Sequence, residues 1–522
     1  MRETYYKLLF KKGTFTAHEV KSGALHGKPN DPRMLTNWRP IALLPCDSKI
    51  LSSYIANNLK IYMDEVITRA QSAFVPGRSI QDNIMLIMQV IHHHMHTKEG
   101  AGIIFLDFAH AYDYISQEYV MAVLTALNFP SSLLNAINMM MKDQTGRVIV
   151  NNDLTHKFPV NNGGKQGDPL FPLIYIAAME GLYALLDNNP GIKGIKVPSP
   201  ERDIRFKHLG YADDTAIAIG NKREKEALEH TFKTFENASG NEIKAAKSFV
   251  LWLGRWSDTQ ELIYNIGPLR EGDYERYLGI QIGHRIPEID QWTPTIEKLK
   301  NIFKYWKHFN LSIFGRTLLI NSRMLSQIWY KASLVPTTPA QEKALETHVN
   351  EFFRKGKRNN TVSAATRVLP LRNGGLGQIH IQTQLHLLRI KWIVRANSGD
   401  TPLWSFYWAE NIRRIKAHLQ TETDLEVLSC NWKNIRATEK NGIFPFTLSA
   451  YKSWHVLNFR LNIDQFDTAM CQPLIDNKYI TDPITNQPLR GTPEMKNLIS
   501  HLETIRIGQF FQESEPEEEI QY

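Results

Sequence analysis

The stretch HLGYADDTAIAIG, at His208–Gly220, indicates the fold more clearly than any other part of the sequence. Small and apolar residues flank Asp213 and Asp214 on both sides. This pattern predicts a hairpin of two strands whose tight turn exposes the adjacent acids. An Asp-Asp pair by itself is more often an ordinary turn, so its meaning depends on the rest of the chain.

A third acid follows another predicted strand. In GIIFLDFAHAYDYI, at residues 102–115, the apolar run Ile103–Leu106 predicts a buried strand that ends at Asp107. A carboxylate at the end of a strand meets solvent, and the two hairpin acids would then face it. Carboxylate oxygens are ligands for hard cations such as Mg²⁺. Two such ions serve nucleotidyl transfer, because one activates a primer 3′-hydroxyl and the other neutralises the leaving pyrophosphate.

The composition is that of a folded protein with a polyanionic partner. A length of 522 residues predicts two or three domains around a shared cleft, and 43% hydrophobic and 22% charged residues give no support to a disordered or fibrous class. The net charge of +8 favours a phosphate backbone as partner. Cys46, Cys430 and Cys471 are too far apart for a CxxC zinc pair and indicate a reducing, intracellular setting. No apolar run approaches the length of a membrane span, so no membrane partner is expected.

The pattern of secondary structure changes near residue 285. From Trp38 to about Gly283, short strand-like runs alternate with helical patterns, whereas the later sequence is mostly helical. We therefore expect an α+β fold. The stretch LFPLIYIAAMEGLYALL, at residues 170–186, has helical apolar spacing and is expected to be a core helix.

Seven motifs follow one another along the chain. They are NWRPIALL at Asn37–Leu44, QSAFVPGRSIQDNI at Gln71–Ile84, LDFAHAYD at Leu106–Asp113, GGKQGDPLFPLIY at Gly163–Tyr175, YADD at Tyr211–Asp214, SGNEIKAAKS at Ser239–Ser248 and YLGIQIG at Tyr277–Gly283. In this order they resemble the reverse transcriptases of non-LTR (LINE-type) retrotransposons. The resemblance runs from about Lys28 to Trp408, and several independent matches in the right order make it specific.

The resemblance implies a right-hand polymerase with fingers, palm and thumb and a mostly helical C-terminal region. The fingers and palm would occupy residues 1–285, the thumb and post-thumb connection residues 286–395, and a C-terminal region of unknown role residues 396–522. The implied activity is that of an RNA-directed DNA polymerase, which extends a DNA primer on an RNA template with dNTPs. Its cofactors would be two Mg²⁺ ions, for which Mn²⁺ can substitute, and its setting would be the nucleus.

The resemblance also implies roles for the acids and for one lysine. Asp107 and Asp213 would be the principal metal ligands, with Asp214 as the second acid of the turn. Lys247 lies where related polymerases place a lysine proposed to protonate the departing pyrophosphate. A solvated lysine is the alternative, because Lys244 replaces the asparagine that precedes it in the family.

Five positions are expected to contact the incoming nucleotide. Arg39 lies where the family's fingers place a cation on the triphosphate, although a surface ion pair is the alternative. Lys28 would be a second fingers cation. Tyr112 lies where related polymerases place a ring beneath the sugar, which would exclude a ribose 2′-hydroxyl. Gln166 and Gly167 match the segment along the nascent base pair, where a glycine permits close backbone approach.

A basic helix follows the last motif. Its spacing places apolar residues on one face and Lys300, Lys304 and Lys307 on another. By resemblance this helix belongs to the thumb, and its lysines would follow the backbone of the template–primer duplex without reading sequence. An ordinary amphipathic surface helix is the alternative.

Several departures from the family pattern predict reduced activity. His110 replaces the usual lysine, Lys165 the usual arginine before QGDP, and Phe171 a common serine. The segment GALHGKPND, at Gly23–Asp31, leaves only Lys28 as a fingers lysine. The sequence also begins downstream of a Gly-Pro-Asp-Gly motif of the family and shows no endonuclease region, so we expect an N-terminally truncated part of an element polyprotein.

Two other functions stay open. A degenerate RNA-binding remnant would share the motifs without catalysis, and the altered fingers favour it while the intact acids oppose it. A group II intron maturase would share YADD and QGDP, but it should lack GGLGQIH at Gly374–His380 and PLW at Pro402–Trp404, which resemble the post-thumb region of LINE-type elements.

A histidine cluster lies outside the seven motifs. His92, His93, His94 and His96 follow an apolar helical run. We expect a solvated helix end there rather than a transition-metal site.

Overall fold

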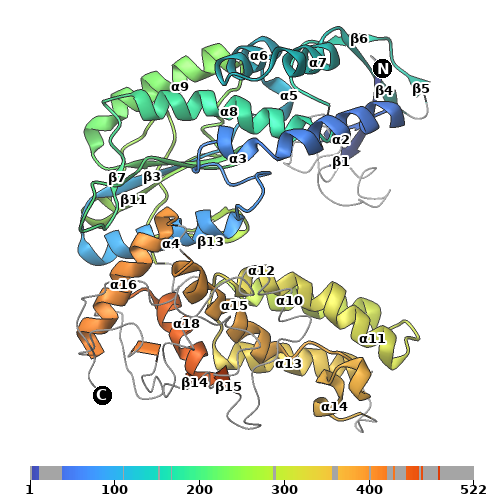
Figure 1. The fold of residues 1–522 in the computed structure, drawn as a ribbon, viewed down its shortest axis with the longest axis vertical. Coiled ribbons are helices and arrows are strands. Elements are labelled where there is room, and N and C mark those ends of the chain that lie inside the picture. The colour runs from blue at the N-terminus through green and yellow to red at the C-terminus, as the bar shows by residue number, and fades with distance from the viewer. Residues whose placement is uncertain are drawn as a thin grey trace, which may run out of the picture.

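A computed structural model gives the fold of most of the chain. It describes residues 3–10, 38–109, 111–150, 153–165, 167–285, 290–354, 362–398, 401–419, 427–428, 442–457, 460–461 and 480–481. The fold class is α+β, as the sequence predicts: strands and helices alternate up to β13, which ends at Ile282, and helices predominate after it (Figure 1). The division into three regions at residues 285 and 395 stays a prediction.

A four-stranded antiparallel sheet carries the predicted hairpin. Its order is β11-β3-β10-β9. The strands are β3 (Ala101–Leu106), β9 (His208–Tyr211), β10 (Asp214–Ile219) and β11 (Phe249–Leu253). Every residue of β3 is buried, because helices cover both faces of the sheet, and this explains why its sequence is apolar without alternation.

The two faces of this sheet pack on different partners. Ile104, Ile217 and Trp252 point to a core that includes helices α6 (Gln117–Ala126), α8 (Phe171–Asn188) and α9 (Lys225–Ser239). Phe105 and Leu251 point to a second core that begins with α4 (Ile80–Thr97) and continues into the helical half of the chain. In Figure 1, α8 and α9 lie above the sheet and α4 lies below it. The core helix expected at residues 170–186 is thus confirmed as α8.

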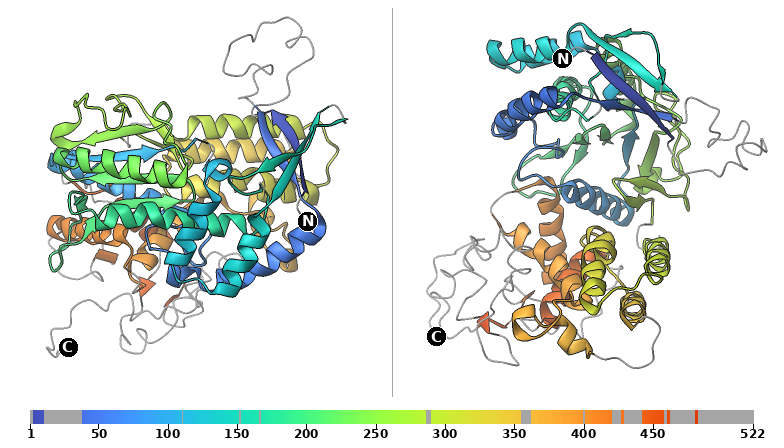
Figure 2. Two further views of the ribbon diagram at one scale, coloured as in Figure 1. Left: turned by 90° about the horizontal axis from the view of Figure 1, so that it is seen from above. Right: turned by 90° about the vertical axis from the view of Figure 1, so that its right-hand side faces the viewer.

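A second sheet lies beside the first and contains the N-terminal residues. Its path is β2-β1-β4-β5, and β6 also pairs with β4. The strands are β1 (Glu3–Phe10), β2 (Trp38–Leu43), β4 (Gln144–Val150), β5 (Asp153–Leu154) and β6 (Phe158–Val160). Strand β1 runs antiparallel to β2 and parallel to β4, so it joins segments more than a hundred residues apart. The views in Figure 2 show this sheet at one end of the molecule.

The second half of the chain is a group of packed helices. They are α10 (Thr293–Trp306), α11 (Ile313–Leu319), α12 (Ser326–Ala332), α13 (Pro339–Arg354), α14 (Ala364–Val368), α15 (Ile381–Ala396), α16 (Leu403–Leu419) and α18 (Pro445–Val456). A small hairpin of β12 (Glu275–Tyr277) and β13 (Ile280–Ile282) precedes them. Within the described residues, no helix has the length and apolarity needed to cross a membrane.

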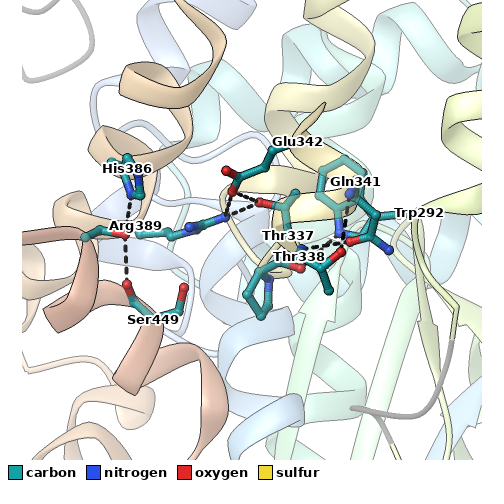
Figure 3. Close-up of polar contacts among 10 residues, drawn as sticks. Trp292, Thr337, Thr338, Gln341, Glu342, His386, Arg389 and Ser449 are labelled. Carbon is teal, nitrogen blue, oxygen red and sulfur yellow. Dashed lines mark hydrogen bonds and ion pairs between the residues drawn. The ribbon is translucent and has the colours of Figure 1, made fainter. Parts of the chain in front are cut away.

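Polar contacts fasten the start of α13 to α15. Thr338 and Gln341 form a reciprocal capping box, because the Gln341 side chain accepts from the Thr338 N–H at 2.9 Å and the Thr338 hydroxyl accepts from the Gln341 N–H at 3.3 Å. Glu342, in the same turn, pairs with Arg389 of α15 at 3.3 Å, and both side chains are largely buried. Figure 3 shows Arg389 reaching across to this turn. The paired charges thus fix how the two helices meet.

The PLW motif docks the helical half onto α4. The Trp404 indole N–H donates to the Asp82 carboxylate at 3.0 Å, and Arg395 pairs with the same carboxylate at 2.7 Å. The Arg395 guanidinium also lies over the Trp392 and Trp404 rings, 4.9 and 5.6 Å from their centroids. Residues far apart in the sequence therefore meet in one partly buried cluster at the start of α4.

The GGLG motif is held by a π-helical segment that follows α11. Asn321, within the π-helical residues Ile320–Leu325, donates to the Gly377 carbonyl at 2.8 Å. Its side-chain oxygen accepts from the Ile379 N–H at 3.1 Å. One side-chain amide thus pairs with backbone groups of both Gly377 and Ile379, and the motif has a structural role here.

The expectation of a solvated helix end at the histidine cluster is wrong for three of the four histidines. His94 is buried, and His92 and His93 are half-buried, whereas His96 is exposed. The rings of His92 and His93 lie 5.4 Å from those of Phe444 and Tyr407 respectively. Burial first, and then neighbouring histidines and Arg414, lowers the pKa of His92 to about 4 and that of His93 to about 3. These imidazoles are neutral packing groups at neutral pH.

Candidate active site

Strand register brings the three predicted acids to one edge of the four-stranded sheet. Leu106 of β3 pairs with Thr215 of β10, so the next residue of each strand end, Asp107 and Asp214, continues the same antiparallel register. Asp214 also pairs with Tyr211 across the hairpin, which leaves Ala212 and Asp213 as the turn. The hairpin predicted from the sequence is confirmed.

The charges of the three acids act on one another. Partial burial first, and then the charges of Asp213 and Asp107, raises the pKa of Asp214 to about 6. Asp213 and Asp107 can contribute to this shift only from short range, because solvent would screen a distant carboxylate. The acids at strand end and turn therefore form one electrostatic unit.

The backbone around Asp107 is fixed by the segment before β11. The Asp107 N–H donates to the Ser248 hydroxyl at 3.0 Å, and its carbonyl accepts from the Lys244 N–H at 2.8 Å. The Lys247 ammonium lies 3.6 Å from Oδ2 of Asp107. That oxygen is buried and accepts no hydrogen bond within the described residues. Ser248 was not singled out from the sequence, although it ends the SGNEIKAAKS motif.

The acids have the donor chemistry of a site for Mg²⁺. Their ligand atoms are carboxylate oxygens, which hard cations prefer. Oδ2 of Asp107, which accepts no hydrogen bond within the described residues, is free to coordinate a cation. Among the described residues, no group of three or more His, Cys, Asp or Glu side chains is arranged to hold one metal ion. The residues fit the ion chemically, and its charge would relieve their mutual repulsion.

Tyr112 stands next to the acids on a rigid support. Its ring stacks on Tyr175 of α8, with centroids 4.4 Å apart and planes 28° apart. Burial, followed by the charge of Asp213, raises the pKa of Tyr112 above its usual value. A side chain held in this way keeps its orientation, as a steric gate must.

Two glycines not assigned from the sequence hold the backbone of Tyr112. The Gly164 N–H donates to the Tyr112 carbonyl at 3.0 Å. A Cβ on Gly163 would lie 2.5 Å from the same carbonyl oxygen, and one on Gly164 would lie 2.0 Å from the Phe171 ring. Because any side chain would collide there, GG of the GGKQGDP motif serves close packing rather than flexibility.

The rest of the GGKQGDP segment is attached to helix α2 (Cys46–Lys60). The Ser52 hydroxyl of α2 donates to the Asp168 carboxylate, which also accepts from the Leu170 N–H at 2.9 Å. Lys165 is buried, and burial lowers its pKa. Gly167 has a φ of +89°, which a glycine adopts without strain, and its approach to a base pair stays a prediction.

Three of the expected substrate contacts are not tested by the structure. Arg39 lies in β2, where its backbone pairs with Leu9 of β1, but its side chain is not described. Lys28 and Gln166 lie outside the described residues. Their roles stay predictions.

Comparison of the sequence with known protein families identifies the family of this chain. Residues 26–282 match the reverse transcriptase (RNA-dependent DNA polymerase) family. This chain belongs to the reverse transcriptases. It is 31% identical over 396 residues to the "Transposon TX1 uncharacterized 149 kDa protein" of Xenopus laevis, a match that covers 73% of this chain and 29% of that protein.

Other relatives extend the comparison. The chain is 25% identical over 226 residues to a "Retrovirus-related Pol polyprotein from type-1 retrotransposable element R2" of Popillia japonica, covering 42% of this chain and 30% of that protein. The matches therefore span less than a third of the length of these two relatives. Among solved structures, apo telomerase from Candida tropicalis is similar with a TM-score of 0.41 and 11% identity, over 78% of this chain and 69% of the other. The matches to the TX1 and R2 proteins relate this reverse transcriptase to non-LTR retrotransposon proteins.

The lysines expected on the thumb of this reverse transcriptase lie on one face of α10 and, for Lys307, at the cap of its C-terminal end. Lys300, Lys304 and Lys307 are exposed, while Leu299 and Phe303 are buried against α13 and its neighbours. The amphipathic division predicted from the sequence is confirmed. Contact with nucleic acid stays a prediction.

Proposed function

We propose that this chain is the RNA-directed DNA polymerase of a non-LTR retrotransposon, which extends a DNA primer on an RNA template by two-metal nucleotidyl transfer. One observation carries the proposal. Strand register sets Asp107 opposite Asp214, beside the turn residue Asp213, and burial, followed by the charges of Asp213 and Asp107, raises the pKa of Asp214 to about 6. Repulsion of this kind is maintained in a fold where cations are to be bound.

Each residue of the site has a defined task in this proposal. Asp107 and Asp213 would hold two Mg²⁺ ions, which activate the primer 3′-hydroxyl and neutralise the departing pyrophosphate. Lys247, whose Nζ lies 3.6 Å from Oδ2 of Asp107, would give its Nζ proton to the pyrophosphate oxygen as the bond between that oxygen and the α-phosphorus breaks. Tyr112, stacked on Tyr175, would block the space that a ribose 2′-hydroxyl needs.

The partners follow from charge and position. The net charge of +8 and the exposed lysines of α10 support binding of an RNA template paired with a DNA primer. DNA insertion would also need a nick in the target, which we assign to another protein or segment. We further propose the nucleus as the setting, which a fluorescent fusion of this chain would test.

Primer extension on poly(rA)–oligo(dT) with purified chain, Mg²⁺ and dTTP tests the proposal. The wild-type chain should add nucleotides, and Asp213→Ala should add none above background. Asp203→Asn is the matched control, because Asp203 is an exposed acid paired only with Arg205 among the contacts described. A wild-type chain that binds the template but adds no nucleotide at any salt or metal concentration would instead identify the RNA-binding remnant.

A further inference from the structure

The turn that carries Asp213 has an unusual backbone. Ala212 has a φ of +59°, in the left-handed region, where a residue with a Cβ is strained. The first position of a two-residue hairpin turn is usually Gly, Asn or Asp when its φ is positive. Other contacts must therefore hold Ala212, and with it Asp213, in place.

The side chain of Gln71 makes those contacts from outside the hairpin. Its Oε1 accepts from the Ala212 N–H at 3.0 Å, and its Nε2 donates to the Ala212 carbonyl at 3.4 Å. The same amide accepts from the Ala73 N–H at 3.0 Å and donates to the Tyr183 hydroxyl at 3.3 Å. Gln71 is fully buried, so solvent does not compete for these bonds.

The strand before the turn is built to admit this amide. A Cβ on Gly210 would lie 2.7 Å from Nε2 of Gln71 and 2.0 Å from the Tyr183 hydroxyl. The Gly210 carbonyl accepts from the Ser72 N–H and from the Asn83 side chain, each at 2.9 Å. Residues of the segment from Gln71 to Asn83 thus form hydrogen bonds with the backbone of both Gly210 and Ala212, on either side of Tyr211.

We propose that Gln71 is a positioning residue, whose amide holds the two peptide groups on either side of Ala212 and so aims the Asp213 carboxylate at the reacting atoms. The role rests on the proposed polymerase function for its catalytic consequence. A primary amide suits it, because it donates to the Ala212 carbonyl and accepts from the Ala212 N–H at once. Gln71 touches no reacting atom and acts through the turn.

Hydrogen exchange measured by mass spectrometry tests the clamp without reference to activity. In Gln71→Met, the peptide that contains Ala212 and Asp213 should exchange at least tenfold faster than in the wild type, since the Ala212 N–H loses its acceptor. The matched control is Gln89→Met. Gln89 is an equally buried glutamine of α4 whose amide makes no hydrogen bond within the described residues, so exchange at the turn should stay unchanged.

A second variant keeps the test decisive if Gln71→Met does not fold. Gln71→Glu retains an oxygen that accepts from the Ala212 N–H but loses the donor to the Ala212 carbonyl. Protection of the Ala212 amide should therefore stay within about threefold of the wild type. Turn exchange as slow in Gln71→Met as in the wild type, or turn exchange in a folded Gln71→Glu more than tenfold faster, would overturn the proposal.

The catalytic readout is a split between turnover and binding. Gln71→Met should lower kcat for nucleotide addition by roughly a hundredfold, the usual consequence of a 1 Å misplacement, with KM for dTTP and Kd for primer–template within about threefold. Gln89→Met should retain wild-type kcat. A folded Gln71→Met with wild-type kcat would contradict the positioning role. If the wild-type chain itself adds no nucleotide, the proposed function fails, while the exchange experiment still decides whether Gln71 holds the turn.

Discussion

The acids at the edge of the four-stranded sheet and the lysines on α10 are two charged sets built in opposite ways. Asp107 and Asp214 are more than a hundred positions apart, and only the pairing of β3 with β10 brings them together. Lys300, Lys304 and Lys307 follow from the period of one helix and lie in open solvent. The acids are crowded enough to shift a pKa, whereas the lysines are spread along a surface. Acids that lie close together can act on one reacting centre, whereas lysines spread along a helix can bind successive phosphates of a long polyanion.

The largest effect expected from this contrast is loss of turnover without loss of binding. Asp107→Asn keeps the size of the side chain but removes the charge that offsets the cations, so kcat should fall by at least about a thousandfold. Primer–template Kd, measured by fluorescence anisotropy, should stay within about threefold. An Asp107→Asn chain that extends primers at the wild-type rate would remove Asp107 from the site.

Sugar selectivity should change next. Tyr112→Ala removes the ring that stacks on Tyr175 and should improve rATP use relative to dATP by roughly 10–200-fold, with dATP incorporation still measurable. Competition between the two nucleotides on a poly(rU) template measures this ratio. Tyr112→Phe keeps the ring and serves as control. Equal discrimination in Tyr112→Ala and wild type would end the gate assignment.

The lysines should show the opposite behaviour from the acids. Replacing Lys300, Lys304 and Lys307 with Gln should reduce the slope of log K against log salt by about 3, roughly 0.9 for each phosphate contact, with kcat at saturating template nearly unchanged. Lys233→Gln, on the exposed face of α9, should leave the slope as it is. An unaltered slope in the triple variant would mean that these lysines only solvate the helix.

The smallest effect concerns stability. Because the folded chain raises the pKa of Asp214 to about 6 from its usual value of 3.8, the folded state binds more protons than the unfolded state between these values, and stability falls as pH rises through them. Asp214→Asn should therefore stabilise the chain at pH 7, by on the order of 1 kcal/mol after solvent screening. Thermal melting in EDTA would measure the gain, which should vanish below about pH 4. A variant less stable than wild type at pH 7 would contradict the repulsion.

The comparison also explains what could be predicted from the sequence. The amphipathic face of α10 and the hairpin at Tyr211–Asp214 depend on neighbouring residues, and both were predicted correctly. The clamp by Gln71 and the attachment of Trp404 to Asp82 depend on contacts between distant segments, which periodicity does not encode. The prediction of a solvated helix end at the α4 histidines was also wrong because of distant contacts. The aromatic partners of His92 and His93, Phe444 and Tyr407, come from much later in the chain.

The position of β1 has a practical consequence for work with this protein. Since β1 is flanked by β2 on one side and β4 on the other, removing residues Glu3–Phe10 would leave two unprotected strand edges in place of one continuous sheet. Open edges recruit strands from other molecules, so a shortened chain would be prone to aggregate. Affinity tags belong ahead of Glu3 on a flexible spacer, and expression limits drawn at the first recognisable motif, Asn37–Leu44, would omit a central strand.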